Sequence, residues 1–227
     1  MQKLGRRQTL ELVLLVLLIG SVWGILEITL GSFLHAIHFP QKGAVMGGLA
    51  VSLMAFFTAL TGKPQLVPLL GLIAALLKPF SVFYLSVPLL SPFIINPGLA
   101  IILEAVAFTA VVLVGKKVMA KTVAAKMVAG MMAGAFGIIA YAFVASIIGL
   151  GMWPALALAE KVQVALTAAL PVALAGGLML VAGDYAGKLS FGRLNAIKMF
   201  YPKAYYSALA FLVFFSWVLP PLFKVGG

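Results

Sequence analysis

The sequence has no cysteine, only five acidic residues and a charged fraction of 9% in 227 residues. The absence of cysteine excludes a small secreted scaffold held by disulfides. An ordinary soluble domain is about 25% charged, so the shortage of charge excludes a cytosolic enzyme and a disordered chain. What the chain has instead is 64% hydrophobic residues and a mean hydropathy of +1.18. This composition predicts an all-α fold, a polytopic transmembrane helical bundle, because a helix satisfies its own backbone hydrogen bonds in lipid.

The charged residues are mostly positive: the sequence has 16 Lys and Arg and 5 Asp and Glu, which gives a formal net charge of +11. The cations stand between the apolar runs, so we interpret them as topology signals facing membrane lipid rather than as a nucleic-acid site. The first of them, Lys3, Arg6 and Arg7, precede an apolar run that reaches about Leu34. A cleaved signal peptide has an apolar core of about 7–15 residues. We therefore expect this longer run to be the first membrane span.

Hydropathy predicts seven spans, near residues 12–34, 43–61, 64–77, 97–115, 127–150, 162–182 and 204–222. The third is short and rich in proline, so we expect a kinked span followed by an apolar outer loop. The predicted organisation is a six-span bundle over residues 1–187, followed by a basic inner segment and a seventh span over residues 188–227. The basic segment is either a short amphipathic piece on the membrane surface or a linker.

The distribution of Lys and Arg provides an independent test of the number of spans. With seven spans and a cytoplasmic N-terminus, twelve Lys and Arg fall on inner segments and four on outer ones. Cytoplasmic segments of membrane proteins carry the excess of positive charge. The sequence therefore predicts a multi-pass protein of the cell (plasma) membrane with its N-terminus inside.

Small residues recur at helical spacing on two of the predicted spans, at Gly20 and Gly24 and at Gly130 and Gly134. Such residues let helix backbones approach closely. These faces either pack within the bundle or dock a partner subunit.

Two carboxylates, Glu27 and Glu104, lie within spans and at the same depth, about 10 Å below the outer rim at 1.5 Å per residue. Ionisable groups in a membrane usually face a protein interior or a wet cavity. We expect a cavity that opens to the outside and binds a small-molecule substrate. The candidate substrate-binding residues are Glu27, His35, His38, Lys78, Tyr84, Asn96, Glu104 and Trp153. In the alternative interpretation each Glu is paired locally and has a structural role.

Motifs for chemistry are missing. The segment GDYAGKLS at residues 183–190 has the wrong spacing for a phosphate-binding loop, and no hydrolase or metalloprotease motif occurs. The pair His35 and His38 has metal-ligand spacing but no obvious third ligand. We expect no enzymatic activity, no cofactor and no bound metal.

A small basic membrane protein with an outward pocket and no ATPase resembles the substrate-binding S component of an energy-coupling factor (ECF) transporter. Two segments carry the resemblance: GSVWG at residues 20–24, and HFPQKGAVMGGLAVSLMAFF at residues 38–57. The resemblance implies a six-helix bundle that binds a vitamin or vitamin precursor near the outer surface. It also implies a transmembrane coupling subunit, docked through small residues of the first helix, and separate ATPases. The seventh span departs from this family.

Two other functions stay open. The chain could be a non-catalytic structural subunit of a larger membrane complex, with its small-residue faces in permanent contact with other subunits. A membrane-embedded enzyme acting on lipid is the third possibility, although no catalytic constellation supports it.

Overall fold

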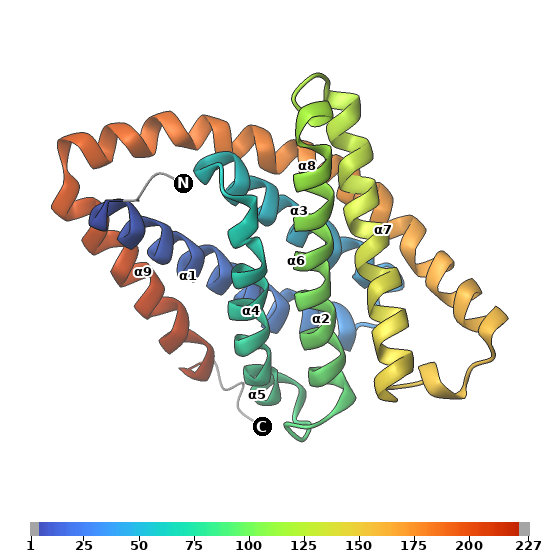
Figure 1. Cartoon of the computed structure of the whole chain (residues 1–227). Coiled ribbons are helices and arrows are strands. Elements are labelled where there is room, and N and C mark those ends of the chain that lie inside the picture. Colours follow the sequence, from blue (N-terminus) through green and yellow to red (C-terminus); the bar gives the residue numbers. More distant parts are fainter. Residues whose placement is uncertain (1–4, 223–227) are drawn as a thin grey trace.

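A computed structural model describes residues 5–222 of the chain, and every regular element in that range is helical (Figure 1). The all-α prediction is therefore confirmed. The elements are α1 (Arg6–Ile28), α2 (Leu30–Ala36), α3 (Lys42–Thr61), η1 (Pro64–Leu66), α4 (Val67–Leu77), η2 (Lys78–Ser81), α5 (Val82–Leu85), α6 (Pro92–Met119), α7 (Val123–Ile148), η3 (Trp153–Ala155), α8 (Leu158–Phe200) and α9 (Pro202–Leu222).

Six helical segments are long and apolar enough to cross a membrane: Arg6–Ala36, Lys42–Thr61, Pro64–Ser81, Pro92–Met119, Val123–Ile148 and Leu158–Phe200. They coincide with the first six predicted spans, and the chain is a multi-pass membrane protein. The third segment is built from η1, α4 and η2, and its short 3-10 turns begin at Pro64 and just before Pro79. Proline has no backbone N–H, so it is well tolerated at a helix start. The predicted kinked span is thus a short α-helix between two 3-10 turns.

Local sequence explains where several helices begin and end. The Thr122 hydroxyl accepts a hydrogen bond from the backbone N–H of Ala125 at the start of α7. Helices α3 and α7 end at Gly62 and Gly149, with φ values of +66° and +76°. A left-handed residue at this position turns the chain out of the helix, and glycine adopts it without strain.

The centre of the bundle is the packing of α8 against α3 and α7. Helix α8 approaches both neighbours through glycine: a Cβ atom at Gly183 would overlap the carbonyl oxygen of Ser52 on α3, and one at Gly130 of α7 would overlap that of Gly176 on α8. Such close backbone contact is typical of membrane helices. The hydrophobic effect does not drive helices together in lipid, and small residues allow the close packing that holds them instead.

The four glycines predicted to dock a partner are covered by helices of the same chain. A Cβ atom at Gly20 or Gly24 would lie 2.8 Å from side-chain atoms of α4, and one at Gly134 would lie 2.8 Å from a backbone oxygen of α8. Gly130 is covered by α8 in the same way. A second subunit has no room on these faces, so the docking prediction is corrected to packing within the bundle.

Helix α8 has 43 residues and continues without interruption to Phe200. The predicted boundary between residues 187 and 188 therefore falls inside a helix. Lys188, Arg193 and Lys198 of the predicted inner segment lie on α8 and Lys203 lies on α9, so residues 188–200 continue the sixth helical segment. In Figure 1, α8 runs from the lower right to the upper left of the view, and α9 returns downward beside α1.

The predicted seventh span corresponds to α9, which is not among the six segments above and which packs on α1. At one end of this contact the Tyr205 hydroxyl donates to Glu11 Oε1 at 3.1 Å, and at the other the Trp217 indole N–H donates to the Ser21 hydroxyl at 3.0 Å. Helix α9 therefore belongs to the fold of this chain.

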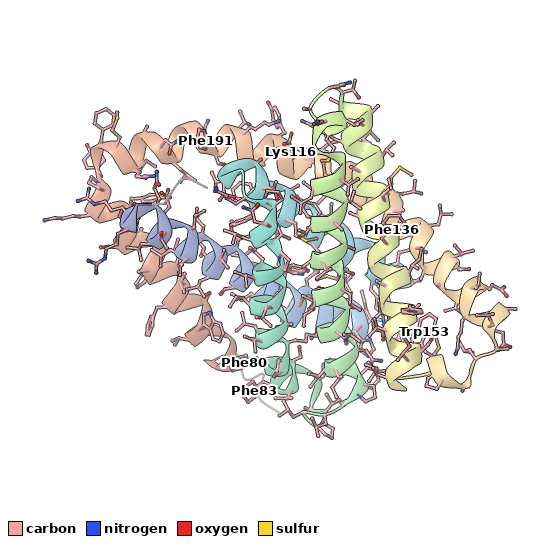
Figure 2. All side chains as sticks on the ribbon, viewed as in Figure 1. Phe80, Phe83, Lys116, Phe136, Trp153 and Phe191 are labelled. Atoms are coloured by element: carbon pink, nitrogen blue, oxygen red, sulfur yellow. The ribbon has the colours of Figure 1, made fainter. Side chains whose placement is uncertain are left out.

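The bundle has two chemically different ends. We call residues 27–46, 78–97 and 149–163 the pocket end, and residues 5–12, 61–66, 115–126 and 184–204 the basic end. Figure 2 shows Phe80, Phe83 and Trp153 toward the former and Lys116 and Phe191 toward the latter. Within residues 5–222 the pocket end carries Lys42, Lys78 and Lys161, and the basic end carries Arg6, Arg7, Lys63, Lys116, Lys117, Lys121, Lys126, Lys188, Arg193, Lys198 and Lys203.

Candidate ligand-binding pocket

A cavity of about 540 Å³ opens at the pocket end. This volume lies within the range of about 300–1,000 Å³ that is typical of small-molecule sites. Five separate segments contribute to its wall. The lining residues are Glu27, Gly31, Ser32, His35, Lys42, Gly43, Met46, Lys78, Leu85, Pro92, Phe93, Asn96, Pro97 and Met152.

The break between α1 and α2 determines how Glu27 is presented. Helix α1 ends at Ile28, and the last carbonyl groups of a helix lack partners within it. The Lys78 ammonium, from the start of η2, donates a hydrogen bond of 2.9 Å to the Glu27 carbonyl oxygen. A cation at a helix C-terminus also interacts favourably with the helix dipole. Lys78 thus caps α1 and brings its charge to the cavity.

The side chains of Glu27 and Lys78 form a buried but loose ion pair. Their residues are only 7% and 4% exposed, and Lys78 Nζ lies 3.8 Å from Glu27 Oε2. A direct hydrogen bond between such groups would be about 2.7–2.9 Å long. Within residues 5–222 no group meets strict hydrogen-bond geometry to the Glu27 carboxylate, although the buried indole N–H of Trp23, one turn earlier, and the Lys78 ammonium both lie near it. Both charged groups therefore keep unused hydrogen-bonding capacity.

Two neutral polar groups in the wall are also unpartnered. The Ser32 hydroxyl, on a residue 5% exposed, and the Asn96 Oδ1 atom are buried without a hydrogen-bond partner in the described part of the chain. Burying such a group unpaired costs about 1–3 kcal/mol. Both atoms lie behind the surface of the cavity, since neither is accessible to solvent.

At the mouth of the cavity, His35 contacts the tilted ring of Phe93 and is hydrogen-bonded to Lys42. The ring of His35 lies 4.8 Å from the ring of Phe93, and Lys42 Nζ lies 2.8 Å from His35 Nδ1. An ammonium group can only donate, so Nδ1 is the acceptor and the imidazole is neutral with its proton on Nε2.

The loop between α7 and α8 reaches the same cavity through Met152, and the neighbouring Gly151 lies against Asn96. Gly151 has a φ of +61°, and a Cβ atom there would lie 3.1 Å from Asn96 Nδ2. Both the backbone conformation and the close approach to Asn96 favour glycine at this position. Residue 151 thus allows the loop to lie against the wall of the cavity.

Glu104 lies one layer deeper than the residues that line the cavity. Its side chain fits between glycines: a Cβ atom at Gly137 would lie 2.9 Å from its Cγ, and one at Gly47 would lie 3.9 Å from its Oε1. Gly47 follows Met46, which lines the cavity, and the Glu104 carboxyl is close enough to Glu27 for their charges to interact. The structure therefore brings the two intramembrane acids to the same end of the bundle.

Four predicted residues, Glu27, His35, Lys78 and Asn96, line the cavity, whereas Glu104, Trp153 and His38 are not among its lining residues. Trp153 packs below Tyr141 at a ring distance of 6.2 Å, in a separate apolar cluster. His38 is exposed, with a φ of +54°. The side chain of Tyr84 lies outside the part of the chain that the structure describes.

Sequence reasoning missed Ser32, Phe93 and Met152 as individual residues of the wall. A serine in the apolar run after Glu27 was an available signal for the first. Within residues 5–222 no group of three or more His, Asp or Glu side chains is placed to hold a metal ion. Comparison of the chain with models of protein families, with curated proteins and with solved structures finds no match.

Proposed function

We propose that the chain is a substrate-binding membrane subunit of an uptake system, in which the cavity at the pocket end holds a small molecule such as a vitamin or vitamin precursor. The observation that carries the proposal is the buried, loosely paired Glu27–Lys78 couple in the wall of a 540 Å³ cavity. Charged groups in membrane helices are costly and mark functional sites. At 3.8 Å the two side chains leave hydrogen-bonding capacity that a ligand could use.

The sidedness of the charges supports an outward-facing pocket. Only Lys42, Lys78 and Lys161 lie at the pocket end, whereas the other described Lys and Arg residues lie at the basic end. By the positive-inside rule the basic end faces the cytoplasm. The proposal therefore places the N-terminus inside and the cavity toward the outside of the plasma membrane.

The proposal assigns the source of energy to other subunits. The sequence offers no phosphate-binding loop. In the ECF-type arrangement the energy would come from separate ATPases that act through a membrane coupling subunit. Because Gly20 and Gly24 contact α4 of the same chain, a coupling subunit would have to bind another surface.

The test is ligand binding by the purified protein in mild detergent. Native mass spectrometry detects a co-purified small molecule, and thermal-shift assays measure stabilisation by a panel of vitamins, their precursors and amino acids. We expect at least one bound compound and a loss of binding in Glu27→Gln. The matched control is Glu11→Gln, since Glu11 lies on the same helix at the other end.

The outcome that contradicts the proposal is equally specific. A monodisperse protein that binds no compound, with Glu27→Gln indistinguishable from the parent, would favour the structural-subunit alternative. Crosslinking in native membranes would then yield a stable complex without ATPases.

A further inference from the structure

The polar part of the cavity presents opposite charges side by side. Lys78 Nζ and Glu27 Oε2 are 3.8 Å apart, with the unpartnered Ser32 hydroxyl and Asn96 Oδ1 atom in the same wall. Lys78 uses one of its three N–H groups on the Glu27 carbonyl oxygen. The Lys78 ammonium can therefore donate hydrogen bonds to an anion, and the neighbouring Glu27 carboxylate can accept hydrogen bonds from a cation.

A ligand with a single charge fits this couple poorly. A cation bound at Glu27 would lie beside the Lys78 ammonium, and an anion bound at Lys78 would lie beside the Glu27 carboxylate. Repulsion between like charges at this range is strong in a buried site, because the effective dielectric constant is low. A ligand with both charges on neighbouring atoms satisfies both partners and adds no net charge to the membrane interior.

The remainder of the wall is largely apolar, with His35 and Lys42 bonded to each other at the mouth. Beside the charged couple the cavity is lined by Met46, Leu85, Phe93, Pro97 and Met152. Methionine side chains adapt to ligands of different shape and contact aromatic rings favourably. This surface accommodates an aliphatic or aromatic group of moderate size.

From this arrangement we infer that the ligand is an α-amino acid with a large apolar side chain. Its carboxylate binds Lys78, and its ammonium group binds Glu27. The side chain lies among Met46, Phe93 and Met152. This inference rests on the proposed function and names its substrate class.

The test uses probes that share one body and differ only in charge. L-phenylalanine carries both groups, phenethylamine only the ammonium, and 3-phenylpropionate only the carboxylate. Binding to the purified full-length protein is measured by calorimetry, with L-tryptophan, L-leucine and L-methionine as further members of the class. We expect L-phenylalanine to bind at least about tenfold more tightly than either single-charge analogue, because a buried charge left unpaired is costly.

Two variants are expected to change which of the three probes binds most tightly, and not only to weaken binding. Glu27→Gln keeps the Lys78 cation, so the preferred probe shifts toward 3-phenylpropionate. Lys78→Met keeps the Glu27 anion, so the preference shifts toward phenethylamine. A misfolded variant would lose all three probes, whereas opposite shifts in the two variants report the two charges separately.

The matched controls are Glu11→Gln and Lys198→Met, which alter the Glu–Lys pair at the basic end and should leave the affinity ratios unchanged. The inference is overturned if none of the four amino acids binds, or if either single-charge analogue binds as tightly as L-phenylalanine. Binding of an uncharged or singly charged compound from the vitamin panel would overturn it too, while leaving the proposed function in place.

Discussion

Helix α1 carries a Glu–Lys pair at each end, and the two pairs differ in almost every respect except composition. At the basic end both oxygens of Glu11 are engaged, one by Lys198 of α8 and the other by the Tyr205 hydroxyl of α9. At the pocket end no group within residues 5–222 meets strict hydrogen-bond geometry to the Glu27 carboxylate, and Lys78 stays 3.8 Å away. The first pair joins three helices. The second is buried, open and next to a cavity.

Exposure sharpens the difference between the two pairs. The side chains of Lys198 and Glu11 are 33% and 16% exposed, whereas those of Lys78 and Glu27 are 5% and 9% exposed. The Glu11–Lys198 pair is partly exposed to water, and both Glu11 oxygens accept hydrogen bonds. The Glu27–Lys78 pair is buried, and its side chains are too far apart for a direct hydrogen bond. An incomplete buried pair is what a binding site for a charged ligand requires.

The largest effect is expected from a test of sidedness. The chain has no cysteine, so Gln41→Cys at the pocket end and Lys121→Cys at the basic end each introduce a single thiol. In intact cells a membrane-impermeant maleimide should label only Gln41→Cys, and Lys121→Cys should react only after permeabilisation. Both residues are exposed, so access depends on the side of the membrane.

The unmodified chain is the blank for this labelling experiment. Labelling of Lys121→Cys alone in intact cells would place the cavity toward the cytoplasm. The chemical difference between the pocket end and the basic end would be unchanged, but the proposed direction of transport would be reversed.

Removing the cation of the buried pair should have the next largest effect. Lys78→Met leaves the Glu27 carboxylate buried without a counter-charge and α1 without its cap. We expect a loss of about 3–5 kcal/mol in the free energy of unfolding, measured by denaturation in SDS–detergent mixtures. The double variant Glu27→Gln/Lys78→Met should recover part of this loss. A Lys78→Met protein as stable as the parent would show that the pair contributes nothing to the fold.

At the basic end the corresponding change should cost less. Lys198→Met removes a partly exposed cation from Glu11, which still accepts the hydrogen bond from Tyr205. We expect a loss of about 1 kcal/mol or less, because partly solvated ion pairs contribute little. The same denaturation assay measures it. If Lys198→Met lost as much free energy of unfolding as Lys78→Met, the difference in burial between the two pairs would have no effect on their contribution to stability.

The smallest effect is expected for a pair on the surface of α8. Lys188 lies 2.8 Å from Asp184, one turn earlier, and its side chain is 59% exposed. Lys188→Met should change the free energy of unfolding by no more than about 0.5 kcal/mol, because Asp184 keeps Lys126 as a partner. Added salt should reduce the difference further, and a salt-independent loss above 1 kcal/mol would contradict this account.

Much of the fold could be predicted from the sequence. Hydropathy locates the first six spans, and the count of Lys and Arg correctly retains the proline-rich third one. The length of α8 was not predicted, because Lys188, Arg193 and Lys198 indicate either a short amphipathic surface piece or a linker and not a continuation of the sixth span. Pro202 gave a usable signal, since a helix commonly ends near the residue before a proline, and α8 ends at Phe200.

The site could be predicted only in part. The depth of Glu27 and Glu104 follows from helical rise, so their arrival at one end of the bundle was predictable. The pairing of Glu27 with Lys78 was not, because 51 residues separate them and the contact depends on how α1 and η2 are rotated. Trp153 shows the same limit: an aromatic residue in an outer loop can face the cavity or the protein interior, and here it packs below Tyr141.

The contact between α1 and α9 has a consequence for biogenesis. The bonds that join these helices link residues 194 and 196 positions apart in the chain. During synthesis α1 enters the bilayer long before α9 leaves the ribosome, so one flank of α1 initially faces lipid or the insertion machinery. Native packing around Ser21 and Glu11 is thus completed only near the end of translation, and truncated chains should be preferred substrates for membrane proteases.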